Sequence, residues 1–363
     1  MDKVLFFVQL PPPIHGAAIC NQTIVDSAVI SEEIEVRVLP IKFSNSITEM
    51  QRNGVRKLLK MFPMMLKLTY ELVFNRPKLV YFTISPLGFS FLRDTLFVAI
   101  IKIFGIKVLY HLHGKGIADQ KSHFRKYLYK FVFKNTHIIC LSKKLAKDIE
   151  VVKGNAVVSI CPNGVDKEEF GNPLVTNVIE LLFLSNLLPS KGLYEFLEMA
   201  KNLIEEGYDV NVNLAGPFND KFKEGDLDVF LNQNPKLIDQ FVYHGPVSGI
   251  KKWALLERAD ILVHPTLNDA FPLVILEAMA SGCAIVSTEQ GGIPDILEGN
   301  AFGLIVPVGD SVRLFDSVVE MISNPGYLKL CQKNAKEEYQ EKYTMEMFEK
   351  NIASILKKAS AES

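Results

Sequence analysis

Two acidic residues, Asp269 and Glu277, flank the start of an apolar segment that reads as a helix. Pro272 is expected at its first helical position and Gly282 just past its end, the usual punctuation of a helix. A helix N-terminus offers unpaired backbone N–H groups and the positive end of the dipole, which suits a diphosphate. Glu277 is then placed to reach a ribose hydroxyl, and Asp269 a sugar hydroxyl. The alternative is a buried helix with two incidental acids.

The whole segment from His264 to Ile296 resembles the donor-binding signature of the retaining glycosyltransferases of family 4. That signature runs from an acid through seven residues to a glutamate, then small-Gly-x-x-Val, then Gly-Gly-x-Pro-acid. This chain supplies Asp269, Glu277 and the stretch Gly291–Asp295 in that order. The first acid is Asp where the family usually has Glu, so the sugar contact is expected to shift by about one methylene.

The resemblance extends over nearly the whole chain and implies an α/β GT-B architecture with two Rossmann-like domains facing each other across a cleft. It also implies transfer of a sugar from a nucleotide-sugar donor with retention of configuration. No metal is required, because a helix dipole and basic residues neutralise the leaving diphosphate. The family's front-face mechanism needs no covalent nucleophile, and no side chain here is an obvious one.

Alternating elements support that architecture independently. Short apolar runs alternate with helical patterns, which favours parallel, doubly wound sheets. The runs expected as strands are 4–8, 35–39, 79–83, 107–111, 137–141, 157–160, 178–184, 210–214, 240–243, 261–264, 284–287 and 303–305. Helices expected in the first half are 17–28, 56–74, 89–104, 124–133 and 143–150.

Four parts of the chain follow from this pattern. Residues 1–167 are predicted to form an acceptor-binding Rossmann-like domain, and residues 168–176, rich in turn formers, a linker. Residues 177–340 are predicted to form the nucleotide-sugar-binding domain. Residues 341–363 are expected to form a final helix that returns toward the first domain, as in the family.

The second domain contains the remaining donor-binding candidates. Lys191 matches the family lysine that holds the diphosphate, but Asn186 stands where the family has Arg, which removes a charge and a bidentate donor. Gly216 ends a strand where backbone can approach a ligand closely, and Val247 belongs to a turn that lies against the base in the family. The start of the apolar helix adds Phe271, Leu273 and Val274. Alone, Lys191 also fits a solvated lysine at a helix start.

In the first domain, Gly16 matches a glycine of the family's turn near the donor phosphates, and the preceding His15 is either a contact or a loop histidine without a role. His113 stands before Gly114 at a strand end, which in the family lies near the anomeric centre, with His111 as the alternative. Either can stabilise charge that develops on the sugar. With Lys191 and Asp269, His113 completes the predicted catalytic set.

Cysteine usage and charge limit the remaining possibilities. The five cysteines are scattered and form no CxxC pair, so neither zinc nor a disulfide framework is expected, and a reducing compartment fits. Residues 50–134 hold 16 Lys/Arg and three Asp/Glu, an excess of +13; since the whole chain carries −1, the rest carries −14. Neither the N-terminal apolar run nor residues 96–106 suits a signal peptide or a membrane span.

That basic block contains two amphipathic stretches, Arg52–Lys67 and Lys121–Lys134, in which basic residues interleave with apolar and aromatic ones. Such stretches suit an anionic membrane surface; the alternatives are solvated helix faces, or nucleic acid, for which no motif is present. A cytoplasmic protein is expected, peripheral on the inner face of the plasma membrane.

The predicted function is transfer from a UDP- or GDP-linked sugar, without a further cofactor, to a lipid-linked glycan in surface polysaccharide synthesis such as lipopolysaccharide O-antigen or capsule. Two rivals remain. The substitution of Asn186 suggests a non-catalytic scaffold of the same fold, and a sugar-nucleotide epimerase would use the same donor site.

Overall fold

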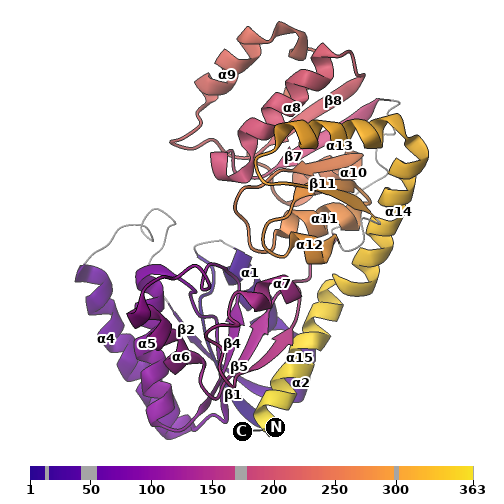
Figure 1. Ribbon diagram of the computed structural model, residues 1–363. Helices are drawn as coiled ribbons and strands as arrows, with labels where there is room; N and C mark the ends of the chain where they lie inside the picture. The colour runs from indigo at the N-terminus through magenta and orange to yellow at the C-terminus, as the bar shows by residue number, and fades with distance from the viewer. Residues whose placement is uncertain (13–15, 42–54, 168–177, 298–301, 363) are drawn as a thin grey trace. The chain divides into compact units, whose positions relative to one another are not determined.

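The computed structural model describes residues 1–12, 16–41, 55–167, 178–297 and 302–362, with backbone alone for 55–60 (Figure 1). The chain divides into two compact units. The first comprises Met1–Asn163 and Glu346–Ser363, and the second Gly164–Met345. The predicted linker at 168–176 lies outside the described residues. None of the described helices is long and apolar enough to cross a membrane.

The first unit is built on a parallel six-stranded sheet. Its strand order is β2-β1-β3-β4-β5-β6. The strands are β1 (Asp2–Val8), β2 (Ile34–Pro40), β3 (Leu79–Phe82), β4 (Lys107–Leu112), β5 (His137–Cys140) and β6 (Val157–Ile160). The central strands β3, β4 and β5 are buried over nearly their whole length, as expected for a sheet covered by helices on both faces.

Helices cover this sheet on two sides. They are α1 (Gly16–Asp26), α2 (Ala28–Glu33), α4 (Val55–Tyr70), α5 (Gly88–Ile103), α6 (His123–Phe133), α7 (Lys143–Lys147) and α15 (Met345–Ala361). Figure 1 shows α4, α5 and α6 along one side and α2 and α15 along the other. An ion pair from Lys357 to Glu33 (2.7 Å) and a contact of 2.9 Å between His137 Nε2 and the Glu362 carboxyl group hold the C-terminal segment on this unit.

The second unit contains another parallel six-stranded sheet, ordered β12-β11-β10-β7-β8-β9. Its strands are β7 (Ile179–Leu184), β8 (Val210–Ala215), β9 (Phe241–Tyr243), β10 (Ile261–His264), β11 (Ala284–Thr288) and β12 (Gly303–Val306). Its helices are α8 (Leu193–Glu205), α9 (Glu224–Gln233), α10 (Gly249–Arg258), α11 (Leu273–Ser281), α12 (Ile293–Ile296), α13 (Ser311–Ser323) and α14 (Pro325–Lys342). Numbered within the unit, the strand order is the doubly wound 3-2-1-4-5-6.

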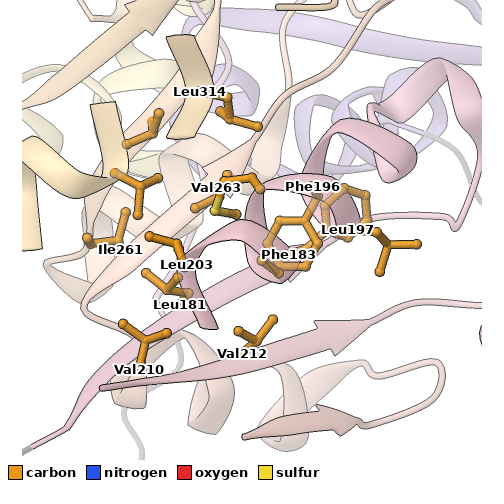
Figure 2. Packing of buried hydrophobic residues seen from close by; sticks show 14 of the residues in the cluster. Leu181, Phe183, Phe196, Leu197, Leu203, Val210, Val212, Ile261, Val263 and Leu314 are labelled. Atoms are coloured by element: carbon orange, nitrogen blue, oxygen red, sulfur yellow. The ribbon is translucent and has the colours of Figure 1, made fainter. Parts of the chain in front are cut away.

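Alternate residues of these strands point into a core beneath α8 and α13. Figure 2 shows Phe183 of β7 beside Phe196 of α8, with Val212 and Val263 from neighbouring strands in the same cluster. The ring centroids of Phe183 and Phe196 are 5.1 Å apart. This packing fixes the carboxyl ends of β7 and β10, from which the site loops leave.

The predicted strands and the α/β class are confirmed, whereas three helix boundaries in the first unit were wrong. The helix expected over 17–28 is two helices, because the Ser27 side chain accepts a hydrogen bond from the Ile30 N–H and starts a new helix. The helix expected to reach residue 74 ends at Tyr70 and continues as a π-helical turn, Glu71–Asn75. The helix expected over 143–150 ends at Lys147.

Candidate functional site

The second sheet has one point where the chain reverses its direction of winding, between β7 and β10. Ligands of doubly wound sheets bind at such a point, outside the carboxyl ends of the strands. The loop after β7 carries Asn186 and Lys191, and the loop after β10 carries Asp269. Two of the predicted catalytic residues thus leave the sheet at the position that topology favours for a ligand.

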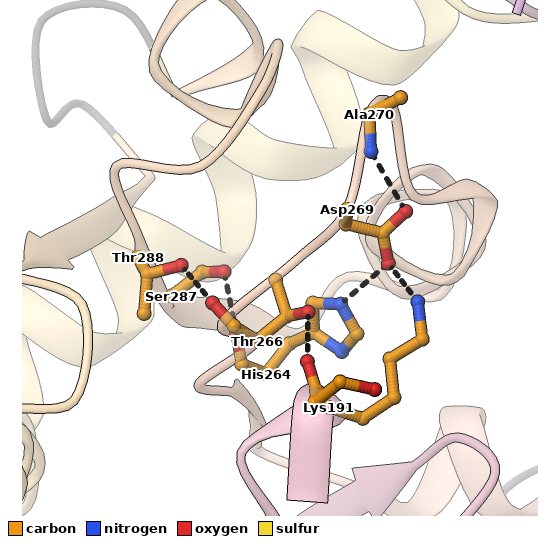
Figure 3. A network of polar contacts seen from close by, with 8 residues as sticks. Lys191, His264, Thr266, Asp269, Ala270, Ser287 and Thr288 are labelled. Carbon is orange, nitrogen blue, oxygen red and sulfur yellow. Dashed lines mark hydrogen bonds and ion pairs between the residues drawn. The ribbon is translucent and has the colours of Figure 1, made fainter. Parts of the chain in front are cut away.

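Asp269 is the centre of a polar network in these loops. Its Oδ2 lies 2.5 Å from Nζ of Lys191 and 3.6 Å from Nε2 of His264 (Figure 3). Its Oδ1 accepts a hydrogen bond from the Ala270 backbone N–H at 3.0 Å. Both partners of the ion pair remain partly exposed, Lys191 by 23% and Asp269 by 19%. The sequence analysis missed His264, although its place at the end of β10 is a usable signal.

Backbone hydrogen bonds tie the two loops together. The carbonyl of Ser190 accepts hydrogen bonds from the backbone N–H groups of Leu267 (3.0 Å) and Asn268 (3.1 Å) and from the Thr266 hydroxyl (3.3 Å). The Thr288 hydroxyl donates to the Thr266 carbonyl at 2.6 Å. Lys191 is therefore positioned by its own loop and by the loop that carries Asp269.

Two glycines allow the loop after β10 to lie close to its neighbours, Gly192 after β7 and Gly291 after β11. Gly192 has φ of +78°, and a Cβ there would lie 1.9 Å from the carbonyl oxygen of Pro265. Gly291 has φ of +51°, and a Cβ there would lie 2.2 Å from the carbonyl oxygen of Ala270. Both conformations are ones that L side chains rarely adopt. The loops could not pack at this distance with a side chain at either position.

The ionisation of Asp269 follows from this network. Burial alone would raise the pKa of its carboxyl group, but the contact with His264 and the positive charge of Lys191 outweigh burial and lower the pKa from 3.8 to about 2. Asp269 is therefore a carboxylate throughout the neutral range. A carboxylate accepts hydrogen bonds only, which suits a sugar hydroxyl.

A pH dependence of stability follows. Because folding depresses the pKa of Asp269, its ionic contribution is fully present above the unfolded value near 3.8 and disappears as the pH falls toward about 2. The shift corresponds to about 2 kcal/mol. We expect Asp269→Asn to lower the free energy of unfolding by about this amount at pH 6 and by about half as much at pH 3, measured by denaturant titration. Asp228→Asn, on exposed α9, is the control, and an equal loss at both pH values would contradict the assignment.

The apolar helix forms as predicted but begins one residue later. Pro272 was expected at the first helical position; it is instead the N-cap, with extended ψ of 118°, and α11 begins at Leu273. Proline is tolerated at the start of a helix, because a backbone N–H at this place would have no partner within the helix. Gly282 ends the helix with φ of +82°. Leu273 and Val274 are half-buried, and Phe271 is buried.

Glu277 lies in the second turn of α11 and already has a partner. Its Oε1 accepts a hydrogen bond from Nζ of Lys252 on α10 at 2.8 Å, and 14% of the Glu277 side chain is exposed. Lys252 was not singled out in the sequence, because a lone lysine in a polar helix gives no signal. The pair leaves the second oxygen of Glu277 to meet a ligand hydroxyl.

The other donor-binding candidates lie at neighbouring strand ends. Asn186 is exposed in the loop after β7. Gly216 follows β8, and a Cβ there would lie 1.8 Å from the carbonyl oxygen of Ser185. The Gly216 N–H donates to the Gly245 carbonyl at 2.9 Å, so the turn that contains Val247 adjoins this loop. The carboxyl ends of β7, β8 and β9 therefore gather these residues on one edge.

The remaining candidates lie in the first unit. Gly16 is exposed at the start of α1, and His15 lies outside the described residues. His113 is half-buried just beyond β4, and its ring centroid lies 4.1 Å from that of His111. His111 is completely buried, and its Nδ1 lies 2.6 Å from the Tyr81 hydroxyl. Of the two histidines, only His113 is partly exposed.

Comparison with known proteins finds relatives among the glycosyltransferases. Residues 164–338, nearly all of the second unit, match the family model described as "Glycosyl transferases group 1". The chain is 25% identical over 247 residues to the phosphatidylinositol N-acetylglucosaminyltransferase gpi3 subunit of Schizosaccharomyces pombe. It is 22% identical over 241 residues to the capsular polysaccharide biosynthesis glycosyltransferase CapM of Staphylococcus aureus.

These alignments are partial, whereas the fold similarity is complete. The gpi3 match covers 66% of this chain and 53% of the relative, and the CapM match 62% of each. The crystal structure of HepE from Anabaena in complex with UDP covers 98% of this chain and 100% of its own, with a TM-score of 0.72 at 17% identity. The fold is therefore that of the GT-B glycosyltransferases.

Proposed function

We propose that this protein is a metal-independent, retaining glycosyltransferase that moves a sugar from a UDP- or GDP-linked donor to a glycan acceptor. The observation that carries the proposal is the Lys191–Asp269 pair at the switch point of the second sheet, within the region that matches group 1 glycosyl transferases. A cation that suits a diphosphate thus lies beside a carboxylate that suits a sugar hydroxyl, which supports the proposal.

Each residue then has a defined task. Lys191 and the N-terminus of α11 at Leu273 neutralise the diphosphate as its bond to the anomeric carbon breaks. Asp269 orients the sugar through a hydroxyl, and Glu277 accepts a hydrogen bond from a ribose hydroxyl. His113 stabilises charge that develops on the sugar, while the acceptor oxygen bonds to the anomeric carbon and its proton passes to the leaving phosphate. The ammonium of Lys191 has three donors, so it can keep Asp269 and still bind phosphate oxygens.

For the acceptor we propose a lipid-linked glycan of surface polysaccharide synthesis, met at the inner face of the plasma membrane by a cytoplasmic protein. The names of the relatives support this: CapM is a glycosyltransferase of capsular polysaccharide biosynthesis, and gpi3 is a subunit of a phosphatidylinositol N-acetylglucosaminyltransferase. In the first unit, Phe124 (65% exposed) and Tyr127 (70%) of α6 stand among basic residues. Phe62 (65%) and Leu66 (55%) of α4 add apolar surface.

Membrane binding through α6 can be measured directly. The double variant Lys126→Gln/Lys130→Gln is expected to lower the partition coefficient onto vesicles with phosphatidylglycerol by about 30-fold, since each lysine near an anionic surface contributes about 1 kcal/mol. Co-sedimentation gives the bound fraction. The double variant Lys333→Gln/Lys336→Gln removes the same charge from α14 and should bind like the wild type. An equal loss of vesicle binding in both variants would mean that net charge, and not the position of the lysines on α6, determines binding.

The donor is identified by a thermal-shift screen of UDP- and GDP-sugars followed by assays of donor hydrolysis. One of them should raise Tm and be hydrolysed slowly without acceptor. Glu277→Gln, which weakens the ribose contact, should bind that donor about 10-fold more weakly, whereas Glu198→Gln on the exposed side of α8 should not. A scaffold would bind no nucleotide sugar, and an epimerase would convert the donor sugar without acceptor; either result overturns the proposal.

A further inference from the structure

Three potential metal ligands converge in the first unit beside the end of β4. One ligand atom each from Cys20 on α1, His111 in β4 and His113 just after it lie within 4.8 Å of one another. The histidines alternate with Leu112 along the strand, so both side chains point to the same face of the sheet. The sequence analysis expected no metal site, because Cys20 is remote from β4 along the chain.

The environment of His111 points to a missing partner. The residue is completely buried, and its Nε2 has no hydrogen-bond partner. The Tyr81 hydroxyl lies 2.6 Å from Nδ1, so Nε2 is the nitrogen left for a ligand. If Nδ1 carries the proton and donates a hydrogen bond to the Tyr81 hydroxyl oxygen, Nε2 presents a lone pair. Such an outer hydrogen bond is what fixes the tautomer of histidines that bind metals.

We propose that Cys20, His111 and His113 form a binding site for a divalent transition-metal ion of the Zn²⁺ class. One thiolate and two imidazoles are ligands that such an ion prefers, and a fourth position remains for solvent. With Zn–S near 2.3 Å and Zn–N near 2.0 Å, tetrahedral ligand atoms are about 3.5 Å apart, so shifts of about 1 Å close the shell.

Metal binding requires a neutral imidazole at His111 and a thiolate at Cys20. Burial and the neighbouring His113 lower the pKa of His111 well below its usual value, so its imidazole is neutral. The Cys20 thiol, whose Sγ lies 3.6 Å from Oδ1 of Asn163, must lose its proton when the metal binds.

Occupancy has a consequence that rests on the proposed function. A metal that holds the lone pair of His113 removes this side chain from the anomeric carbon, so Zn²⁺ should inhibit transfer although transfer needs no metal. The site itself does not depend on that function, because binding can be measured without any substrate.

Co²⁺ reports thiolate ligation spectroscopically. Titration of the full-length protein with Co²⁺ should produce a sulfur-to-metal charge-transfer band in the near ultraviolet. Cys20→Ser should abolish this band and weaken Zn²⁺ binding by at least about 100-fold, whereas Cys331→Ser, at a buried cysteine of the second unit, should change neither. The absence of the band in the wild type, or its survival in Cys20→Ser, would refute the site.

X-ray absorption on the wild type needs no variant and covers the case in which Cys20→Ser fails to fold. Protein loaded with one equivalent of Zn²⁺ should give one sulfur and two or three nitrogen or oxygen neighbours. A shell of nitrogen and oxygen alone, or loss of the zinc on gel filtration, would overturn the proposal. If zinc binds as proposed but transfer is not inhibited, only the placement of His113 in the mechanism fails.

Discussion

Replacing Lys191 with alanine is expected to lower kcat/KM for the donor by about 10²–10³-fold, the usual cost of removing one group that stabilises a leaving charge. The expectation is at the upper end because Asn186 stands where relatives in the proposed family have a second cation. Lys191 is then the main side-chain charge in these loops for the diphosphate. We expect kcat to fall as well as KM to rise, since the charge on the diphosphate grows as its bond to the sugar breaks.

The control for this variant is Lys201→Ala. Lys201 lies on α8, the helix that follows Lys191, and forms an exposed contact of 3.9 Å with Glu205. Exposed pairs of this kind contribute little to stability, so both activity and Tm should stay near wild type. A decrease of less than about threefold for Lys191→Ala would remove Lys191 from the proposed machinery, whatever the control does.

Gly192→Ala is expected to destabilise the second unit by about 3 kcal/mol or more. The added Cβ would lie 1.9 Å from the carbonyl oxygen of Pro265, and φ of +78° is unfavourable for alanine. Relief requires the loops after β7 and β10 to separate, which would also draw Lys191 away from Asp269. We therefore expect a lower Tm together with weaker donor binding, measured by calorimetry at a temperature where the variant is folded.

The variant Gly207→Ala separates the cost of an unfavourable backbone conformation from the cost of a steric clash. Gly207 has φ of +85°, yet nothing lies within 4 Å of its added Cβ. This variant carries the same conformational cost, about 1 kcal/mol, without a clash. If both variants lost equal stability, the close contact between the loops at Gly192 would not be the cause.

The strands and the identity of the loop residues could be predicted from the sequence, because buried parallel strands give near-continuous apolar runs and the loop motifs are contiguous. Asp269 and Lys191 were assigned from such motifs. Their contacts with His264 and with each other depend on strand order, which periodicity does not encode. Lys252 and Cys20 were missed for a related reason. Each lies on a helix, and its contact with a partner depends on how that helix packs against the sheet or a neighbouring helix, which the sequence pattern does not encode.

The boundary errors have a local cause. Ser27 looks like one more residue in a helical run until its hydroxyl is seen to cap α2, and Pro272 is compatible with either the N-cap or the first turn. A single turn residue decides the outcome in each case. Neither the side-chain hydrogen bond of Ser27 nor the extended backbone of Pro272 is visible in the pattern of apolar positions.

The 2.5 Å pair between Lys191 and Asp269 also affects selectivity. A lone lysine at a sheet edge would attract any small anion, including free phosphate. Here the positive charge already has an internal counterion, so a simple anion must compete with a carboxylate that is held in place. A ligand that brings a hydroxyl for Asp269 together with a phosphate for Lys191 satisfies both groups at once. The pair thus favours a molecule that joins the two functions over either fragment alone.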